Sequence, residues 1–244
     1  MKITRPSLLL LFGSIMLSGL AACSQSSNDV ASTDAATAAN IASTATPVNI
    51  YPASFFEPGY TESYIITGSD QVARIYSGTF ELVTSEQTLF NGEAAVPVTS
   101  TLSYTRPING VTVPPITFVL TEYYSVATPR KYLGSVNNDT SVIMVPVASA
   151  TDLPEVVDDE GSGIIGDFTG TDSTLESIAW SLNKLDDNTY QLTYFSQLSD
   201  SAGDIIGSEA ETYGIDSTGE RHTWALDTVL PGQGMAFSFA GTRL

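Results

Sequence analysis

The chain has 244 residues, with 27 aspartates and glutamates against nine lysines and arginines, and a formal charge of −18 at pH 7. A surface of this sign repels nucleic acid and anionic lipid headgroups, so neither is expected as a partner. The single cysteine leaves no pair for a disulfide, and the length is sufficient for a folded domain with its own core.

The first 22 residues have the layout of a secretory signal peptide. Lys2 and Arg5 give a positive start, and removing 1–22 would leave seven basic against 27 acidic side chains, a formal charge of −20. The apolar run from Leu8 to Leu20 is shorter than the about 20 apolar residues that a membrane-spanning helix needs. We therefore expect an exported chain.

Small residues precede the only cysteine in Leu20-Ala21-Ala22-Cys23. This run resembles the lipobox that signal peptidase II reads in bacterial lipoproteins. The resemblance implies cleavage before Cys23, a thioether-linked diacylglycerol on its sulfur, and usually another acyl chain, typically palmitate, on the new amine. Ser24 is similar to the residue found in lipoproteins that are passed to the outer membrane. An ordinary secretory peptide with an incidental cysteine is the alternative.

Residues 23–46 are predicted to be the lipidated N-terminus followed by a disordered linker. Ser24 to Thr46 contain mostly Ser, Thr, Ala, Asn, Asp and Gln and no aromatic residue, so they cannot bury enough apolar surface to offset chain entropy. A short helix over Asp34–Ala42 is the alternative, but isolated helices of this length are marginal in water. As a coil, the linker would span about 25–30 Å.

Residues 47–244 are predicted to form one β-rich domain. Tyr60–Thr67 and Ile75–Thr84 alternate apolar and polar residues, as half-buried strands do. Asn91-Gly92 and Asn109-Gly110 predict hairpins, because both central positions of the favoured turn need positive φ. Further strands are expected at Thr117–Tyr124, Ser141–Val147, Thr189–Leu198 and Met235–Leu244. We expect an all-β, mainly antiparallel fold of about ten to twelve strands, either a single sandwich or an open up-and-down barrel-like domain.

One segment fits two structures. Ser173–Glu176 matches a helix capping box, and apolar residues follow at helical spacing. Ile178, Trp180 and Leu182 also alternate with polar or small residues, and a turn and a clear strand come next. The sequence therefore favours a strand that forms a hairpin with its successor.

Candidate catalytic groups are few. The only histidine, His222, is expected on a strand, where an isolated histidine is usually at the surface or a pocket edge, and no Gly-x-Ser-x-Gly motif presents a nucleophile. One histidine and one lipidated cysteine leave only carboxylates as ligands, which argues against zinc. We therefore assign no catalytic residue, no cofactor and no metal ligand from the sequence.

Calcium is the metal for which the acidic segment 152–176 is considered, since the segment is rich in carboxylates and contains no lysine or arginine. Asp158, Glu160 and Ser162 are similar to the opening of a calcium-binding loop, but Thr169 stands where that loop needs a bidentate glutamate. A solvated acidic loop is the expected structure. Several aromatic residues are expected to pack in the core, with a ligand-facing patch as the alternative: Tyr51, Phe55, Phe56, Tyr60, Tyr64, Tyr123 and Tyr124.

These observations favour a lipid-anchored cell-envelope protein with a non-catalytic interaction or structural role, whose partner is an envelope protein or a polysaccharide. The alternative is a carrier of an apolar ligand, a lipid or a lipoprotein, in a curved β-sheet; several envelope lipoproteins use half-barrels in this way, which is an analogy of fold. An envelope hydrolase with convergent carboxylates is a second alternative. The domain otherwise resembles only uncharacterised envelope lipoproteins. A carrier needs a large apolar cavity, whereas an interaction module has a filled core.

Replacing Cys23 by alanine tests the anchor. Cys23→Ala removes the acylated sulfur, so the protein is expected to leave the membrane fraction, because two or three acyl chains contribute about 0.8 kcal/mol for each buried methylene. Cell fractionation with a carbonate wash and immunoblotting measures the distribution. If the variant still sediments with membranes after the wash, the anchor is wrong.

Overall fold

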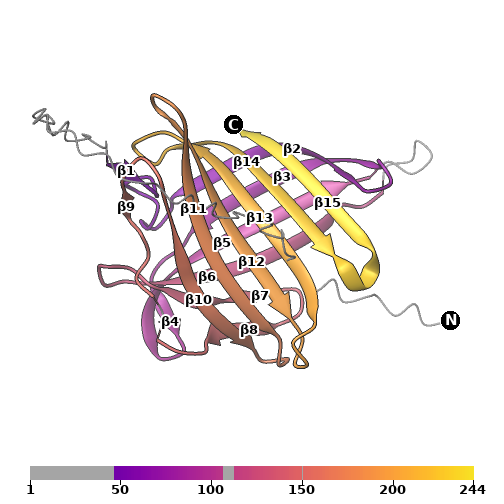
Figure 1. The fold of residues 1–244 in the computed structure, drawn as a ribbon, viewed down its shortest axis with the longest axis horizontal. Coiled ribbons are helices and arrows are strands. Elements are labelled where there is room, and N and C mark those ends of the chain that lie inside the picture. The colour runs from indigo at the N-terminus through magenta and orange to yellow at the C-terminus, as the bar shows by residue number, and fades with distance from the viewer. Residues whose placement is uncertain (1–46, 107–112, 150) are drawn as a thin grey trace, which may run out of the picture.

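The computed structural model describes residues 47–106, 113–149 and 151–244, and these form almost entirely antiparallel β-structure, as the sequence predicts (Figure 1). Cys23, the linker and Asn109-Gly110 lie outside the described residues. The single helix among the described residues is a 3₁₀ turn, Pro231–Gln233. The strands are β1 (Val48–Asn49), β2 (Thr61–Asp70), β3 (Ile75–Thr84), β4 (Thr88–Phe90), β5 (Glu93–Thr105), β6 (Ile116–Ser125), β7 (Tyr132–Asn137), β8 (Val142–Pro146), β9 (Val156–Val157), β10 (Gly161–Gly170), β11 (Leu175–Asp186), β12 (Thr189–Ser199), β13 (Ile205–Ile215), β14 (Arg221–Leu230) and β15 (Met235–Arg243).

Twelve of these strands close into a barrel. Their hydrogen-bonded order is β3-β2-β15-β14-β13-β12-β11-β10-β8-β7-β6-β5, and β5 pairs in turn with β3. Of the two architectures expected from the sequence, the chain forms the barrel, and the β3–β5 pairing closes it. β4 pairs only with the start of β5, and β1 and β9 form a separate two-stranded sheet.

Two local predictions are confirmed. Asn91 and Gly92 have φ of 49° and 85°, and they join β4 to β5 in the tight turn that Asn-Gly favours, with Phe90 opposite Glu93. The segment with two possible structures forms β11, which pairs along its length with β10 and β12. The strand pattern therefore prevails over the capping box, because both edges of the segment are hydrogen-bonded to neighbouring strands.

Alternate residues of each strand point into one shared interior. In β2, Tyr64 and Ile66 are fully buried, whereas Ile65 between them is 56% exposed. Phe80 of β3 and Trp224 of β14 stack with ring centroids 4.2 Å apart, although two strands separate them in the sheet order. An eight-stranded barrel is about wide enough to be filled by side chains, so twelve strands need large aromatic residues to fill the interior.

Residues 47–60, which we call the cap, close one end of the barrel. Ile50 N donates to Glu155 O at 3.0 Å, and Thr84 Oγ1 donates to Phe55 O at 2.6 Å. β1 and β9 pair beside this end in Figure 1. The turns that join β2 to β3, β7 to β8, β10 to β11, β12 to β13 and β14 to β15 lie at the opposite end, which we call the hairpin end.

Gly78 is required where the barrel closes. It lies opposite Tyr104 in the β3–β5 pair, and a Cβ at this position would lie 1.9 Å from Ser103 O. Gly78→Ala is therefore expected to lower the free energy of unfolding by about 1–3 kcal/mol. Urea unfolding followed by tryptophan fluorescence measures the change. Gly232→Ala is the matched control, since a Cβ there meets nothing within 4 Å, and equal stability of the two variants would contradict the closure.

Candidate functional site

The barrel encloses a cavity of about 240 Å³. Its lining comes from every barrel strand except β2, and from Tyr51 and Phe55 of the cap. The volume exceeds the roughly 150 Å³ of an apolar cavity that admits benzene and lies just below the roughly 300–1,000 Å³ of sites for drug-sized ligands. The cavity can therefore hold one small ring system or one alkyl chain.

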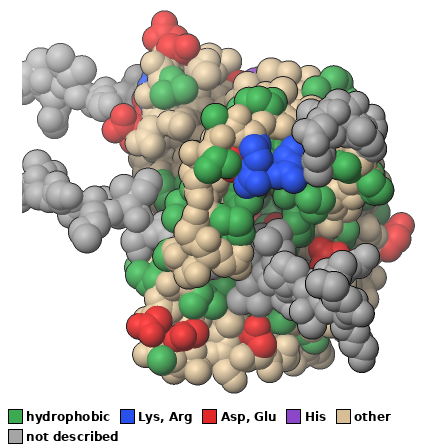
Figure 2. Space-filling model, turned by 90° about the vertical axis from the view of Figure 1, so that its right-hand side faces the viewer, with side chains coloured by type: hydrophobic (Ala, Val, Ile, Leu, Met, Phe, Trp, Pro, Cys, Tyr) green, Lys and Arg blue, Asp and Glu red, His purple; other side chains and the backbone are tan. Residues whose placement is uncertain are grey.

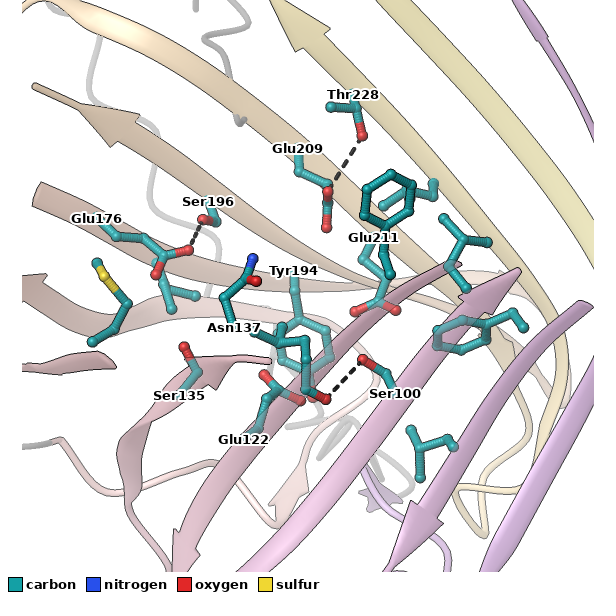
Figure 3. Close-up of a pocket in the computed structure, with 18 of the residues that line it drawn as sticks. Ser100, Glu122, Ser135, Asn137, Glu176, Tyr194, Ser196, Glu209, Glu211 and Thr228 are labelled. Carbon is teal, nitrogen blue, oxygen red and sulfur yellow. Dashed lines mark hydrogen bonds between the residues drawn. The ribbon is translucent and has the colours of Figure 1, made fainter. Parts of the chain in front are cut away.

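Four glutamates project into this cavity; we call Glu122, Glu176, Glu209 and Glu211 the carboxyl cluster (Figure 3). Glu209 and Glu211 occupy successive inward positions of β13, and Glu176 lies two strands away on β11. Glu122 comes from β6, which is opposite β13 in the closed order of strands. Carboxyls from opposite walls therefore face one space.

Neutral donors hold each carboxyl of the cluster. Glu176 accepts a hydrogen bond of 2.5 Å from Ser196 Oγ, and Glu209 accepts one of 3.3 Å from Thr228 Oγ1, as the dashed lines in Figure 3 show. The strand register makes these contacts possible, because Thr228 is directly opposite Glu209, and Ser196 is opposite Ile178, two residues along β11 from Glu176. The neighbouring strands β11 to β14 therefore supply both these acids and their donors.

The other two carboxyls are held by aromatic side chains. Glu211 Oε1 accepts from Tyr213 OH at 2.7 Å and from Trp224 Nε1 at 2.8 Å. Glu122 Oε2 accepts from Tyr124 OH at 3.1 Å. These donors fix the orientation of the carboxyls and bring no positive charge.

Burial raises the pKa of every carboxyl in the cluster. For Glu122, desolvation and then the charge of Glu211 raise the pKa to about 8. Desolvation followed by the charge of Glu211 holds the pKa of Glu209 well above its ordinary value. Desolvation also raises the pKa of Glu176 and of Glu211, and their hydrogen bonds oppose the shift. Burial therefore outweighs the hydrogen bonds at all four positions.

Arg221 is the basic side chain of the interior. It is 2% exposed, and its Nη1 lies 3.8 Å from Oε2 of Glu62, whose side chain is fully buried. The guanidinium also lies over the rings of Tyr213 and Phe55, 3.9 and 4.5 Å from their centroids. Arg221 is therefore engaged at the capped end by one carboxylate and two aromatic faces.

The residues singled out from the sequence are only partly at this site. Tyr51, Phe55 and Tyr124 line the cavity, whereas Tyr123 stacks on Phe90 at 4.1 Å outside the barrel. The remaining aromatic residues of the group are buried in the core or packed against it: Phe56, Tyr60 and Tyr64. Some of these aromatic residues therefore line the cavity, and others pack in the core, so each of the two expected positions is occupied.

His222 does not belong to the cavity. Its side chain is 62% exposed, and its Nε2 lies 3.6 Å from Asp216 Oδ2. This agrees with the expected surface position and places the only histidine of the chain away from the carboxyl cluster.

The acidic segment 152–176 is spread over strands and connections and does not form one loop. Asp159 pairs with Lys184 at 3.3 Å, and Asp152 pairs with Lys131 at 3.8 Å. Glu176, by contrast, points into the barrel. Within the ranges that the structure describes, no three His, Cys, Asp or Glu side chains form a group that could hold a metal ion.

Sequence reasoning did not single out Glu122, Glu209, Glu211 or Arg221. The first of these was detectable, because Glu122 is in phase with Phe118, Leu120 and Tyr124, which share the inward face of β6. A charged residue at an inward position of an alternating strand is therefore a useful sign of an interior site.

Comparisons with known proteins give no relative. No family model matches the chain, and no curated protein and no solved structure matches it. In the part of the chain that the structure describes, no helix has the length and the hydropathy to span a membrane. The function is therefore argued from the cavity alone.

The raised pKa of Glu122 predicts a pH dependence of stability. A carboxyl whose pKa is higher in the folded than in the unfolded protein stabilises the fold fully below its unfolded pKa of about 4.5, and this contribution is lost as the pH rises through about 8. The midpoint of urea unfolding is therefore expected to fall between pH 5 and pH 8.5. Glu122→Gln removes this titration and should flatten the dependence, whereas the control Glu81→Gln, at an exposed position, should leave it unchanged. An unaltered slope in Glu122→Gln would contradict the burial argument.

Proposed function

We propose that this protein is a lipid-anchored binder of a small apolar ligand in the cell envelope, and that it holds the ligand inside the barrel without chemical turnover. The observation that carries the proposal is the cavity of about 240 Å³ with mostly aromatic and aliphatic walls. A module with a purely structural role favours a filled interior, because empty volume lowers stability. The cavity therefore favours the carrier hypothesis over the interaction module.

The proposed location follows from the lipobox-like run at Cys23. An acylated Cys23 would hold the domain at the outer membrane, and the linker 24–46 would place the barrel at a distance from the bilayer. An envelope protein or a polysaccharide that meets the outer surface is a further proposed partner.

The hairpin end is the proposed route for the ligand. The cap covers the other end, and residues at the hairpin end belong to the cavity lining, among them Val142 of β8, Phe237 of β15 and Asp172 in the turn between β10 and β11. Figure 2 shows the face that includes the β2–β3 and β14–β15 turns, where many hydrophobic side chains reach the surface among polar ones. Apolar groups at an entrance would ease the transfer of an apolar ligand from water.

Hydrolysis is the second candidate, because the carboxyl cluster supplies convergent acids with displaced pKa values. A glycosidase pair needs one carboxyl protonated and the other ionised at the working pH. The pKa values of the cluster all shift upward, and none shifts downward as the pKa of an ionised partner would. Binding without turnover is therefore the better proposal.

The test uses the full chain with Cys23→Ala, so that neither an acyl chain nor detergent competes for the cavity. We expect native mass spectrometry to detect a bound apolar compound that is released unchanged on denaturation, and the neutral dye N-phenyl-1-naphthylamine to fluoresce on binding. Ser100→Phe places a ring in the cavity and should weaken dye binding at least tenfold.

Thr101→Phe is the control, since neighbouring residues of a strand point to opposite faces. A bare chain mass together with no dye binding would contradict the proposal. Equal dye binding by the two phenylalanine variants would place the dye outside the cavity. Release of a chemically altered compound would favour hydrolysis.

A further inference from the structure

The cavity contains more carboxyl groups than its own basic side chains can pair with. Its lining includes Asp172 and the four glutamates of the carboxyl cluster, and Arg221 is the only basic residue among the lining residues that the structure describes. Arg221 is already paired with Glu62, which adds a sixth carboxyl to the interior. Among the described residues, the hydrogen-bond donors to the carboxyl cluster are hydroxyl and indole groups. The interior therefore offers acceptors to a cation that the protein itself does not supply.

Such a cluster lowers the stability of the empty barrel. Burying a carboxyl without a paired cation is costly, and apolar residues of similar volume often give a more stable interior. In ligand sites, by contrast, a few polar groups placed in an apolar cavity fix the orientation of the bound molecule. Four carboxyls from opposite walls of one cavity have this arrangement (Figure 3).

A second observation also indicates a bound polar molecule. Nε of Arg221 is buried and has no hydrogen-bond partner, and Arg221 is among the residues that line the same cavity. A buried donor without an acceptor costs roughly 1–3 kcal/mol. This atom is independent of the carboxyl cluster; a protonated amine cannot accept its hydrogen bond, so an oxygen atom elsewhere in the ligand would be needed to satisfy it.

On the basis of the proposed function, we propose that the ligand is a cationic amphiphile, in which a protonated amine lies within the carboxyl cluster and an apolar chain or ring lies against the aromatic walls. An ammonium group has three N–H donors, so it can bond to carboxyls from β6 and β13 at once. The ring of Tyr194 also lines the cavity (Figure 3) and adds a face for a cation.

The same charges select against other amphiphiles. A fatty acid would add another carboxylate to a space lined by four glutamates, and every glutamate that is ionised there would repel it in a buried site. An alcohol of equal length would gain the apolar contacts and lose the ion pairs. The expected order of affinity is therefore amine, then alcohol, then carboxylate.

Three eight-carbon compounds test this order. Octylamine, octanol and octanoate share one alkyl chain and differ in the head group. Each is added as a competitor of N-phenyl-1-naphthylamine bound to the full chain with Cys23→Ala at pH 7. We expect octylamine to displace the dye at a concentration at least tenfold lower than octanol, and octanoate to be the weakest. Because this comparison needs no change inside the barrel, it stands even if substitutions in the cluster impair folding.

Variants of the cluster identify the site. Glu122→Gln and Glu209→Gln are each expected to reduce the preference for octylamine over octanol about fivefold or more. Glu81→Gln removes an equal charge from an exposed position of β3 and is expected to change neither affinity. The comparison therefore separates local contacts from the overall negative charge of the protein.

The outcomes distinguish the two proposals. If the dye binds in the cavity and octanol or octanoate displaces it as well as octylamine does, the amine proposal is overturned and the apolar binder stands. If octylamine is preferred equally by the parent and by both cluster variants, the preference comes from the surface and the amine proposal is again overturned. If the dye does not bind at all, the proposed function itself fails.

Discussion

The pairing of β3 with both β2 and β5 is the constraint on which the rest of the structure depends. It removes both free edges of the sheet, and it makes the inward residues of twelve strands share one enclosed interior. Because eight strands already give an interior about wide enough for side chains, twelve leave a space that the chain must fill by other means. Stacked aromatic residues and the cap fill part of it, and a cavity of about 240 Å³ is left.

Two kinds of buried charge lie in this interior. At the capped end, Glu62 is paired with Arg221 and accepts hydrogen bonds from Tyr60 and Tyr64, so the charge is compensated where it is buried. The carboxyl cluster has only neutral donors, and burial raises the pKa of each of its members. The difference lies in the presence of a cation, since both groups are removed from water. A core selected for stability alone would need only the first arrangement.

Apolar and polar residues alternate with a period of two in the sequence. This alternation predicts the strands, because successive side chains of a barrel strand face the interior and water in turn. The same period identifies Glu122 as an inward residue once the strand has been accepted, since it keeps the phase of Phe118 and Leu120. The sequence does not show that Glu122 meets Glu209 and Glu211, because that meeting depends on closure between strands distant in the chain. Cys23 and the linker stay predictions, since they lie outside the described residues.

Irregularities in the register between neighbouring strands also limit what the sequence pattern can predict about which side chains point inward. Arg221 and Trp224 are three residues apart, so strict alternation would place them on opposite faces of β14. Both are buried, because the register of β13 and β14 shifts between Gly214 and Ile215. A bulge of this kind adds one residue to a strand and reverses the phase of the residues beyond it. Arg221, the one basic side chain among the described residues that line the cavity, therefore owes its position to a feature that no periodic pattern displays.

Because the carboxyl cluster is buried in a closed barrel, binding of the proposed ammonium ligand depends on the protonation of these carboxyls. Near neutral pH the raised pKa values keep protons on part of the carboxyl cluster, so the empty barrel avoids much of the repulsion between its acids. A bound ammonium favours the ionised carboxylates, so its binding releases those protons, and the free energy of release opposes binding more strongly as the pH falls. Burial therefore has two effects on the proposed ligand: it strengthens each ion pair by excluding water, and it makes the formation of the pair depend on proton loss. An exposed carboxyl cluster would lack both effects, because water would already stabilise its charges.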